Sequence, residues 1–167
     1  MPIRKQHLIT VLSALVLSAG LLAPAQKPPA PATQKTGPDY SGMYNFLRDG
    51  EFVQVTVEDH GRVTGFVSRY GDTDSDRGVF LDHFFKEGKL DGNRLAFSTE
   101  TVHGLAYEFR GTIERGDGKN PGDEAYYVLA GTLTENKMDA GNKTSSQPRT
   151  VAFKIFPQDL GSDASKK

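Results

Sequence analysis

The stretch "GLAYEFRGTIE", residues 104–114, alternates large apolar and polar side chains over most of its length. One face of an extended chain here would carry Leu105, Tyr107, Phe109 and Ile113. The other face would carry Glu108, Arg110, Thr112 and Glu114. A period of two residues is the pattern of a strand with one face in the core and one in water. The stretch therefore predicts a half-buried β-strand.

The same period recurs along the chain, and no segment carries a helical stripe. Short turns such as "RDGE" (48–51) and "LDGN" (90–93) separate the runs, and they place Gly beside Asp or Asn, as hairpins require. Eight consecutive strands with short turns favour an all-β fold, a single antiparallel up-and-down eight-stranded β-barrel, because closure removes exposed edges. An open β-sandwich or meander is the alternative. The expected strands are 41–47, 51–58, 62–70, 79–86, 94–102, 104–114, 124–135 and 149–156.

The two ends of the chain differ in composition from this β-rich region. Residues 1–25 combine a positive start, an apolar run at 8–22 and a small-x-small site at Ala23-Pro24-Ala25, which predicts a signal peptide cleaved near Ala25/Gln26. Residues 26–38 are rich in Pro, Ala and Thr and predict an extended linker. We expect the β-barrel domain at 39–160 and a polar tail at 161–167. The expected location is secreted or periplasmic, with no integral membrane segment after cleavage.

Composition and charge exclude several classes of partner. The 167 residues carry a formal net charge of -1 and contain no Cys and no Trp. Cleavage would remove Arg4 and Lys5, leaving 18 basic residues against 21 acidic ones and a charge of -3. This mild acidity argues against nucleic acid or an anionic membrane surface as a partner. Without cysteine there is no disulfide, so packing alone must stabilise the fold.

The stretch "GDTDSDRG" (71–78) resembles a calcium loop at first sight because Asp72, Asp74 and Asp76 alternate. A helix–loop–helix calcium site needs Gly at position 6 and Glu at position 12, where this chain has Arg77 and His83. The flanks are also predicted strands. We therefore interpret the stretch as a solvated loop and predict no metal site, although weak cation binding stays open.

No motif in the sequence identifies a catalytic centre or a cofactor. His60, His83 and His103 have no paired spacing, and there is no H-E-x-x-H, G-x-S-x-G or phosphate-binding Gly loop. The sequence predicts neither catalytic residues nor cofactors. A hydrolase or isomerase with a carboxylate or His in the barrel mouth is the least favoured reading.

The order of motifs resembles the avidin–streptavidin group of barrels. "SGMYNFLRDGEFVQVTVEDHGRVTGFVSRYG" (41–71) is similar to the opening of that family, where a Gly-x-x-Tyr-Asn strand, here Gly42-Met43-Tyr44-Asn45 with one residue fewer, is followed by a Gly-x-hydrophobic-Thr-Gly hairpin. "FRG" (109–111) falls where the family has Trp-Ser-Gly. "YVL" (127–129) falls where it has Trp and two leucines. The resemblance runs over most of 40–156 and implies the same barrel.

The resemblance also implies a ligand site. Asn45 falls on an asparagine that bonds the ureido oxygen of biotin, and Asp49 falls on a serine that shares this task. Arg69 falls on another serine, and Phe109 and Tyr127 fall on wall aromatics. The implied pocket has a polar mouth and an aromatic wall, and its residues are Asn45, Asp49, Arg69, Phe97, Tyr107, Phe109 and Tyr127.

Departures from the family argue against biotin itself. The chain has no Trp for the family's indole walls, and Arg69 brings a charge to a pocket built for a neutral ring. We expect a small-molecule ligand with an apolar body and a polar or anionic end. In the alternative, Arg69 pairs with Asp49, the interior is filled, and the protein is an envelope structural or interaction module. The oligomeric state stays open.

Overall fold

The computed structural model describes residues 38–158, which fall in one compact unit of the chain, Lys35–Lys167. The predicted signal peptide, most of the predicted linker and the predicted tail lie outside these residues. The described part is all-β, with one 3₁₀ turn, η1 (Asp59–Gly61), between the second and third strands. Its strands are β1 (Gly42–Asn45), β2 (Phe52–Val57), β3 (Val63–Tyr70), β4 (Phe80–Asp91), β5 (Arg94–Thr99), β6 (Leu105–Arg115), β7 (Tyr127–Met138) and β8 (Thr144–Lys154).

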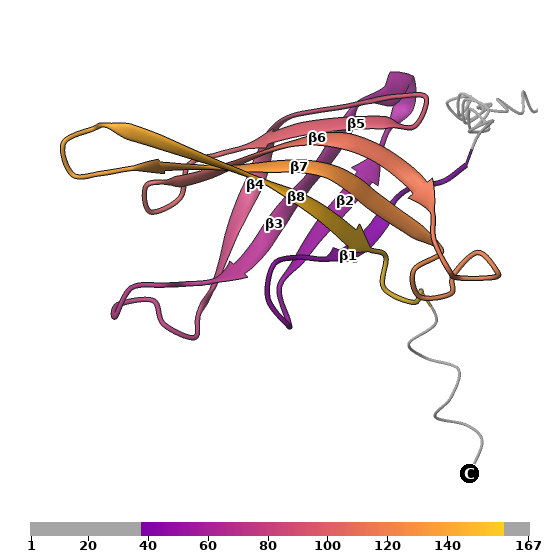
Figure 1. Ribbon diagram of the computed structural model, residues 1–167, viewed down its shortest axis with the longest axis horizontal. Coiled ribbons are helices and arrows are strands. Elements are labelled where there is room, and N and C mark those ends of the chain that lie inside the picture. The colour runs from indigo at the N-terminus through magenta and orange to yellow at the C-terminus, as the bar shows by residue number, and fades with distance from the viewer. Residues whose placement is uncertain (1–37, 159–167) are drawn as a thin grey trace, which may run out of the picture. The chain divides into compact units, whose positions relative to one another are not determined.

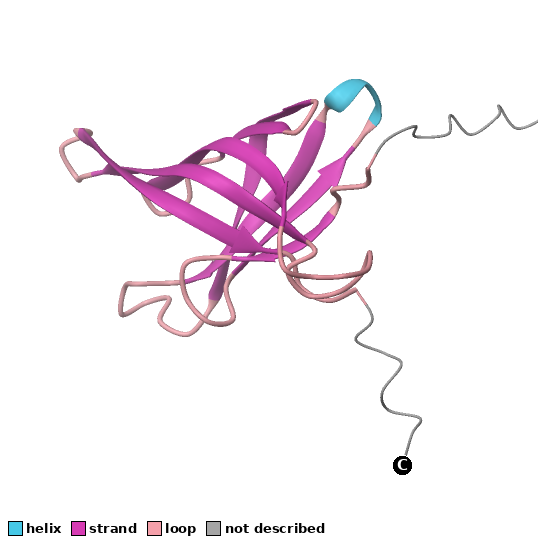
Figure 2. Cartoon of the chain, turned by 45° about the vertical axis from the view of Figure 1, so that its right-hand side comes forward, coloured by secondary structure: helices cyan, strands magenta, loops and turns pink. Residues whose placement is uncertain are grey.

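The eight strands form one antiparallel sheet in which each strand pairs with the next along the chain (Figure 1). The sheet curls until its first and last strands meet (Figure 2). A bridge joins Tyr44 to Ile155, and the backbone N–H of Phe156 donates to the carbonyl of Met43 at 2.8 Å. The prediction of an eight-stranded up-and-down barrel is confirmed.

All eight predicted strands are present, but two are longer than predicted. β4 continues to Asp91 through Gly88, where a side chain would meet the backbone oxygen of Val63, and a bulge lies between Phe85 and Glu87. β8 begins at Thr144 and includes Pro148. Proline lacks a backbone donor, and an edge strand such as β8 tolerates this. Glycine and proline suggested strand ends at positions where the sheet in fact continues.

The barrel interior is filled by alternate residues of the strands. In β6 the apolar face of the 104–114 stretch is buried as predicted, and Glu108, Arg110 and Glu114 are exposed. Aromatic rings stack through the middle, with Phe97 4.3 Å from Phe85 and 5.4 Å from Phe109, between ring centroids. The buried apolar cluster is Tyr44, Phe46, Val53, Val55, Val57, Val63, Val67, Leu95, Phe97, Leu105, Tyr107, Phe109, Ile113, Leu129, Leu133, Phe153 and Ile155.

Outside this core, the β7–β8 hairpin extends beyond the rest of the sheet, and residues 137–150 are exposed (Figure 1). None of the helices in the described part of the chain has the length and apolar character needed to cross a membrane.

Candidate functional site

Polar side chains gather at one end of the barrel, which we call the mouth. The β1–β2 turn (46–51), the β3–β4 loop (71–79) and the β5–β6 turn (100–104) lie at this end. Five acidic or basic residues near it are almost fully buried: Glu51, Arg69, Asp76, His83 and Glu135. Burying a charge is costly unless hydrogen bonds or an opposite charge compensate it, so each of these groups needs a partner.

Glu51 ties the β1–β2 turn to the end of β3. Its carboxylate accepts hydrogen bonds from Arg48 Nε at 2.8 Å, from the backbone N–H of Arg48 at 3.1 Å and from the backbone N–H of Tyr70 at 3.0 Å. Gly50, with φ of 83°, permits the tight turn that brings Glu51 back over Arg48. Glu51 therefore orients Arg48 toward the mouth.

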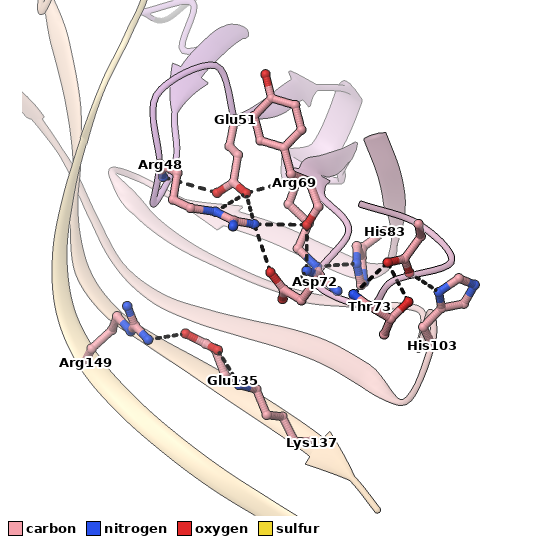
Figure 3. Close-up of polar contacts among 12 residues, drawn as sticks. Arg48, Glu51, Arg69, Asp72, Thr73, His83, His103, Glu135, Lys137 and Arg149 are labelled. Carbon is pink, nitrogen blue, oxygen red and sulfur yellow. Dashed lines mark hydrogen bonds and ion pairs between the residues drawn. The ribbon is translucent and has the colours of Figure 1, made fainter. Parts of the chain in front are cut away.

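Arg69 is the buried cation of the mouth, with 5 % of its surface exposed. Its Nη1 donates to Asp72 Oδ2 at 2.7 Å and to the carbonyl of Tyr70 at 2.8 Å, and its Nε donates to His83 Nε2 at 3.2 Å. Asp72 also lies 3.2 Å from Arg48 Nη2, so one carboxylate bridges two guanidinium groups (Figure 3). The carboxylate that forms the ion pair with Arg69 is that of Asp72, whereas Asp49 is exposed in the neighbouring turn.

His83 is fully buried on the inner face of β4. Burial, and then the positive charge of Arg69, lower the pKa of His83 to about 4, against a weaker opposing effect of the backbone at Glu100 and Leu105. Because Nε2 accepts a hydrogen bond from Arg69, this nitrogen carries a lone pair, and the proton of the neutral ring is assigned to Nδ1. The ring is a neutral support for Arg69 at physiological pH.

A cavity of about 220 Å³ lies within the mouth. On one side are Arg48, Arg69 and Asp72, and on the other Glu135 of β7 pairs with Arg149 of β8 (Figure 3). Arg48 and Arg149 are about half exposed, so the cavity opens to solvent. Its lining residues are Leu47, Arg48, Glu51, Arg69, Asp72, Leu105, Tyr107, Glu135 and Arg149.

Tyr107 lines the cavity on the inner face of β6. The residue is 2 % exposed, and burial raises the pKa of its hydroxyl. The hydroxyl makes no hydrogen bond with any residue between 38 and 158, and it is available to the open cavity. A ligand atom that accepts a hydrogen bond would satisfy it.

The three aspartates of the 71–78 stretch face different partners. Asp72 bridges Arg48 and Arg69, Asp74 pairs with Arg77 at 2.6 Å, and Asp76 is buried. Hydrogen bonds from Thr73, and then from His103, lower the pKa of Asp76 to about 2. Across residues 38–158, no three acidic or histidine side chains are arranged to hold a metal ion.

Only two of the residues predicted for the pocket line the cavity at the mouth, Arg69 and Tyr107. The side-chain oxygen of Asn45 accepts from the backbone N–H of Lys154 at 2.6 Å, which links the two edges of the barrel. Phe97 and Phe109 lie in the central aromatic stack. Tyr127 packs at the opposite end, where it lines a separate hollow of about 300 Å³.

Sequence reasoning missed Glu51, His83 and Glu135. Each falls in phase with apolar residues of its own segment that are buried or half-buried, as Glu51 does with Val53 and Val55. The available signal was a polar residue at a position where the alternation predicts an inward-facing side chain. This signal occurs in three segments that approach the same end of the barrel.

Comparisons with known proteins identify the fold. No protein-family model matches the sequence, and no curated protein matches it. Among solved structures, rhizavidin superposes with a TM-score of 0.54 at 13% identity, over 75% of this chain and 89% of rhizavidin. A low-affinity mutant of shwanavidin gives 0.51 at 10% identity, and apo short afifavidin gives 0.50 at 13%. Both matches cover 71% of this chain and 96% of the other. The chain has the eight-stranded barrel fold of the avidins.

Proposed function

We propose that the protein is an exported barrel, either secreted or periplasmic, that binds a small molecule at its mouth. The avidin-type fold supports this by analogy, since small barrels of this kind often hold one small ligand. The predicted signal peptide supports the location. The observation that carries the proposal is the open cavity at the mouth, lined by charged side chains and by Tyr107, whose hydroxyl makes no hydrogen bond with another residue between 38 and 158.

The size of the cavity limits the ligand. Its volume of about 220 Å³ is below the ~300–1,000 Å³ usual for pockets that enclose a drug-sized molecule. The aromatic stack formed by Phe97 and Phe109 fills the barrel below it. The ligand is therefore small, or only its polar end enters the mouth.

Biotin is not the proposed ligand. The chain lacks the tryptophans expected of a biotin pocket, and its mouth carries Arg48, Arg69 and Arg149 instead of neutral groups. Asn45, which the family resemblance assigns to biotin, uses its oxygen to bind the backbone of β8.

A second candidate function is an interaction module, because aromatic rings cross the outer face of β2, β3 and β4. Phe66 lies 5.8 Å from Phe52 and 5.5 Å from Phe84, between ring centroids. Phe84 is 58% exposed. Exposed aromatic patches often mark contact surfaces. This candidate predicts that substitutions of Phe84 affect partner capture while the mouth tolerates substitution.

Native mass spectrometry of the protein purified from its own host tests the proposed function. We expect a retained small molecule that Tyr107→Phe weakens by about 2- to 12-fold, which corresponds to the ~0.5–1.5 kcal/mol of one hydrogen bond. Tyr127→Phe, at the opposite end of the barrel, is the matched control and should leave binding unchanged. Equal effects of both substitutions, or a protein that never carries a ligand, would favour the interaction module.

A further inference from the structure

We propose that the mouth binds a small oxyanion such as a carboxylate, and that Asp72 occupies the anion's place until the ligand displaces it. This inference rests on the proposed function and names the chemical class of its ligand. Asp72 is 58% exposed, yet its two oxygens lie 2.7 Å from the buried Arg69 and 3.2 Å from Arg48 (Figure 3).

The other acids that line the cavity, Glu51 and Glu135, already have partners. Glu51 is committed to Arg48 and to two backbone N–H groups. Glu135 is paired with Arg149 and lies 3.7 Å from Lys137 Nζ. When Asp72 turns away, Arg69 keeps only a neutral ring and a carbonyl as acceptors. A buried guanidinium needs an anion, and a carboxylate or phosphate matches its planar geometry.

The β3–β4 loop can release Asp72 without coming apart. Its backbone closes through Gly71 N–H to Val79 O at 2.9 Å, and Val79 N–H donates to Asp76 O at 3.0 Å. The carboxylate of Asp76 binds Thr73 and the His103 ring independently of Asp72. These contacts hold the loop, so a rotation of the Asp72 side chain toward solvent vacates the space between the two arginines.

The rest of the cavity fits a short organic anion. Tyr107 offers a hydroxyl within hydrogen-bonding reach of the cavity, and Arg149 offers a third guanidinium on the opposite wall. Leu47 and Leu105 supply apolar surface. A compact carboxylate with a short hydrocarbon chain would use all three, and inorganic phosphate would use only the polar groups.

Amide NMR spectra recorded during titration test the inference with three probes: butyrate, its neutral isostere butyramide, and inorganic phosphate. The variant is Asp72→Asn, which keeps the side-chain shape and removes the competing charge. Asp74→Asn is the matched control because Asp74 lies in the same loop, 94% exposed, and pairs with Arg77 instead. We expect Asp72→Asn to bind butyrate or phosphate at least tenfold more tightly than the wild type, and Asp74→Asn to bind them as the wild type does.

The preferred probe distinguishes an organic carboxylate from a phosphate. Butyramide binding at the mouth as tightly as butyrate would overturn the anion inference while leaving the proposed function in place. An absence of mouth shifts with every probe and variant would overturn the anion inference, whereas the proposed function fails only if the protein from its own host never carries a small molecule. A comparison of butyrate with butyramide on the wild-type protein needs no substitution, so the inference stays testable if Asp72→Asn folds poorly.

Discussion

His83 should make the stability of this protein fall as the pH drops below 6.5. The side chain is fully buried, and its pKa in the folded protein is lowered from 6.5 to about 4, by burial first and by Arg69 second. In the unfolded chain the imidazole regains its ordinary pKa near 6.5 and binds a proton that the folded state rejects. The unfolded state is therefore favoured as the pH falls through 6.5, and the loss levels off only near pH 4.

The size of this effect follows from the two pKa values. The free energy of unfolding should fall by about 2 kcal/mol between pH 8 and pH 5, and by about 3 kcal/mol at pH 4. Urea unfolding at pH values from 8 to 5 measures this decrease in the free energy of unfolding. Asp76, with a pKa of about 2, begins to contribute only at lower pH. His83→Gln removes the titrating group. Between pH 8 and pH 5, the free energy of unfolding of this variant should therefore fall by about 2 kcal/mol less than that of the wild type.

Two results would refute this reasoning. One is a His83→Gln variant whose stability keeps the full pH dependence of the wild type. The other is an NMR titration in which the His83 ring protonates near pH 6.5. The matched control is His60→Gln, because His60 is exposed in the η1 turn, and this variant should keep the wild-type pH dependence.

Two further predictions concern the core and the N-terminus. Phe109→Ala should lower the free energy of unfolding by about 3–5 kcal/mol because the fully buried ring leaves a cavity in the aromatic stack. Phe84→Ala, on the outer face, should cost about 1 kcal/mol or less in the same urea titration, and equal costs would contradict the burial of Phe109. N-terminal sequencing of the exported protein should begin near Gln26, and an intact Met1 on a cytoplasmic protein would contradict export.

The sequence alone predicted the barrel because local patterns decide most of it. Alternation in residues 104–114 places Tyr107 and Phe109 on the inner face, whatever the rest of the chain does. Turns rich in Gly, Asp and Asn then connect each strand to its neighbour, which is the simplest antiparallel order. The strand ends were less certain, and Gly88 and Pro148 lie within strands that tertiary pairing extends.

The site depended on contacts that no local pattern contains. The sequence places Arg69 on the inner face of its strand, but its ion-pair partner is Asp72, set by the path of the β3–β4 loop. His83 comes to Arg69 because β3 and β4 pair in register, with Val67 opposite His83. Glu135 and Arg149 reach the same mouth from β7 and β8, more than sixty residues beyond Arg69 in the sequence. Alternation determines which face of a strand is buried, but only closure of the sheet determines which buried polar groups meet, because their partners lie on strands distant in sequence.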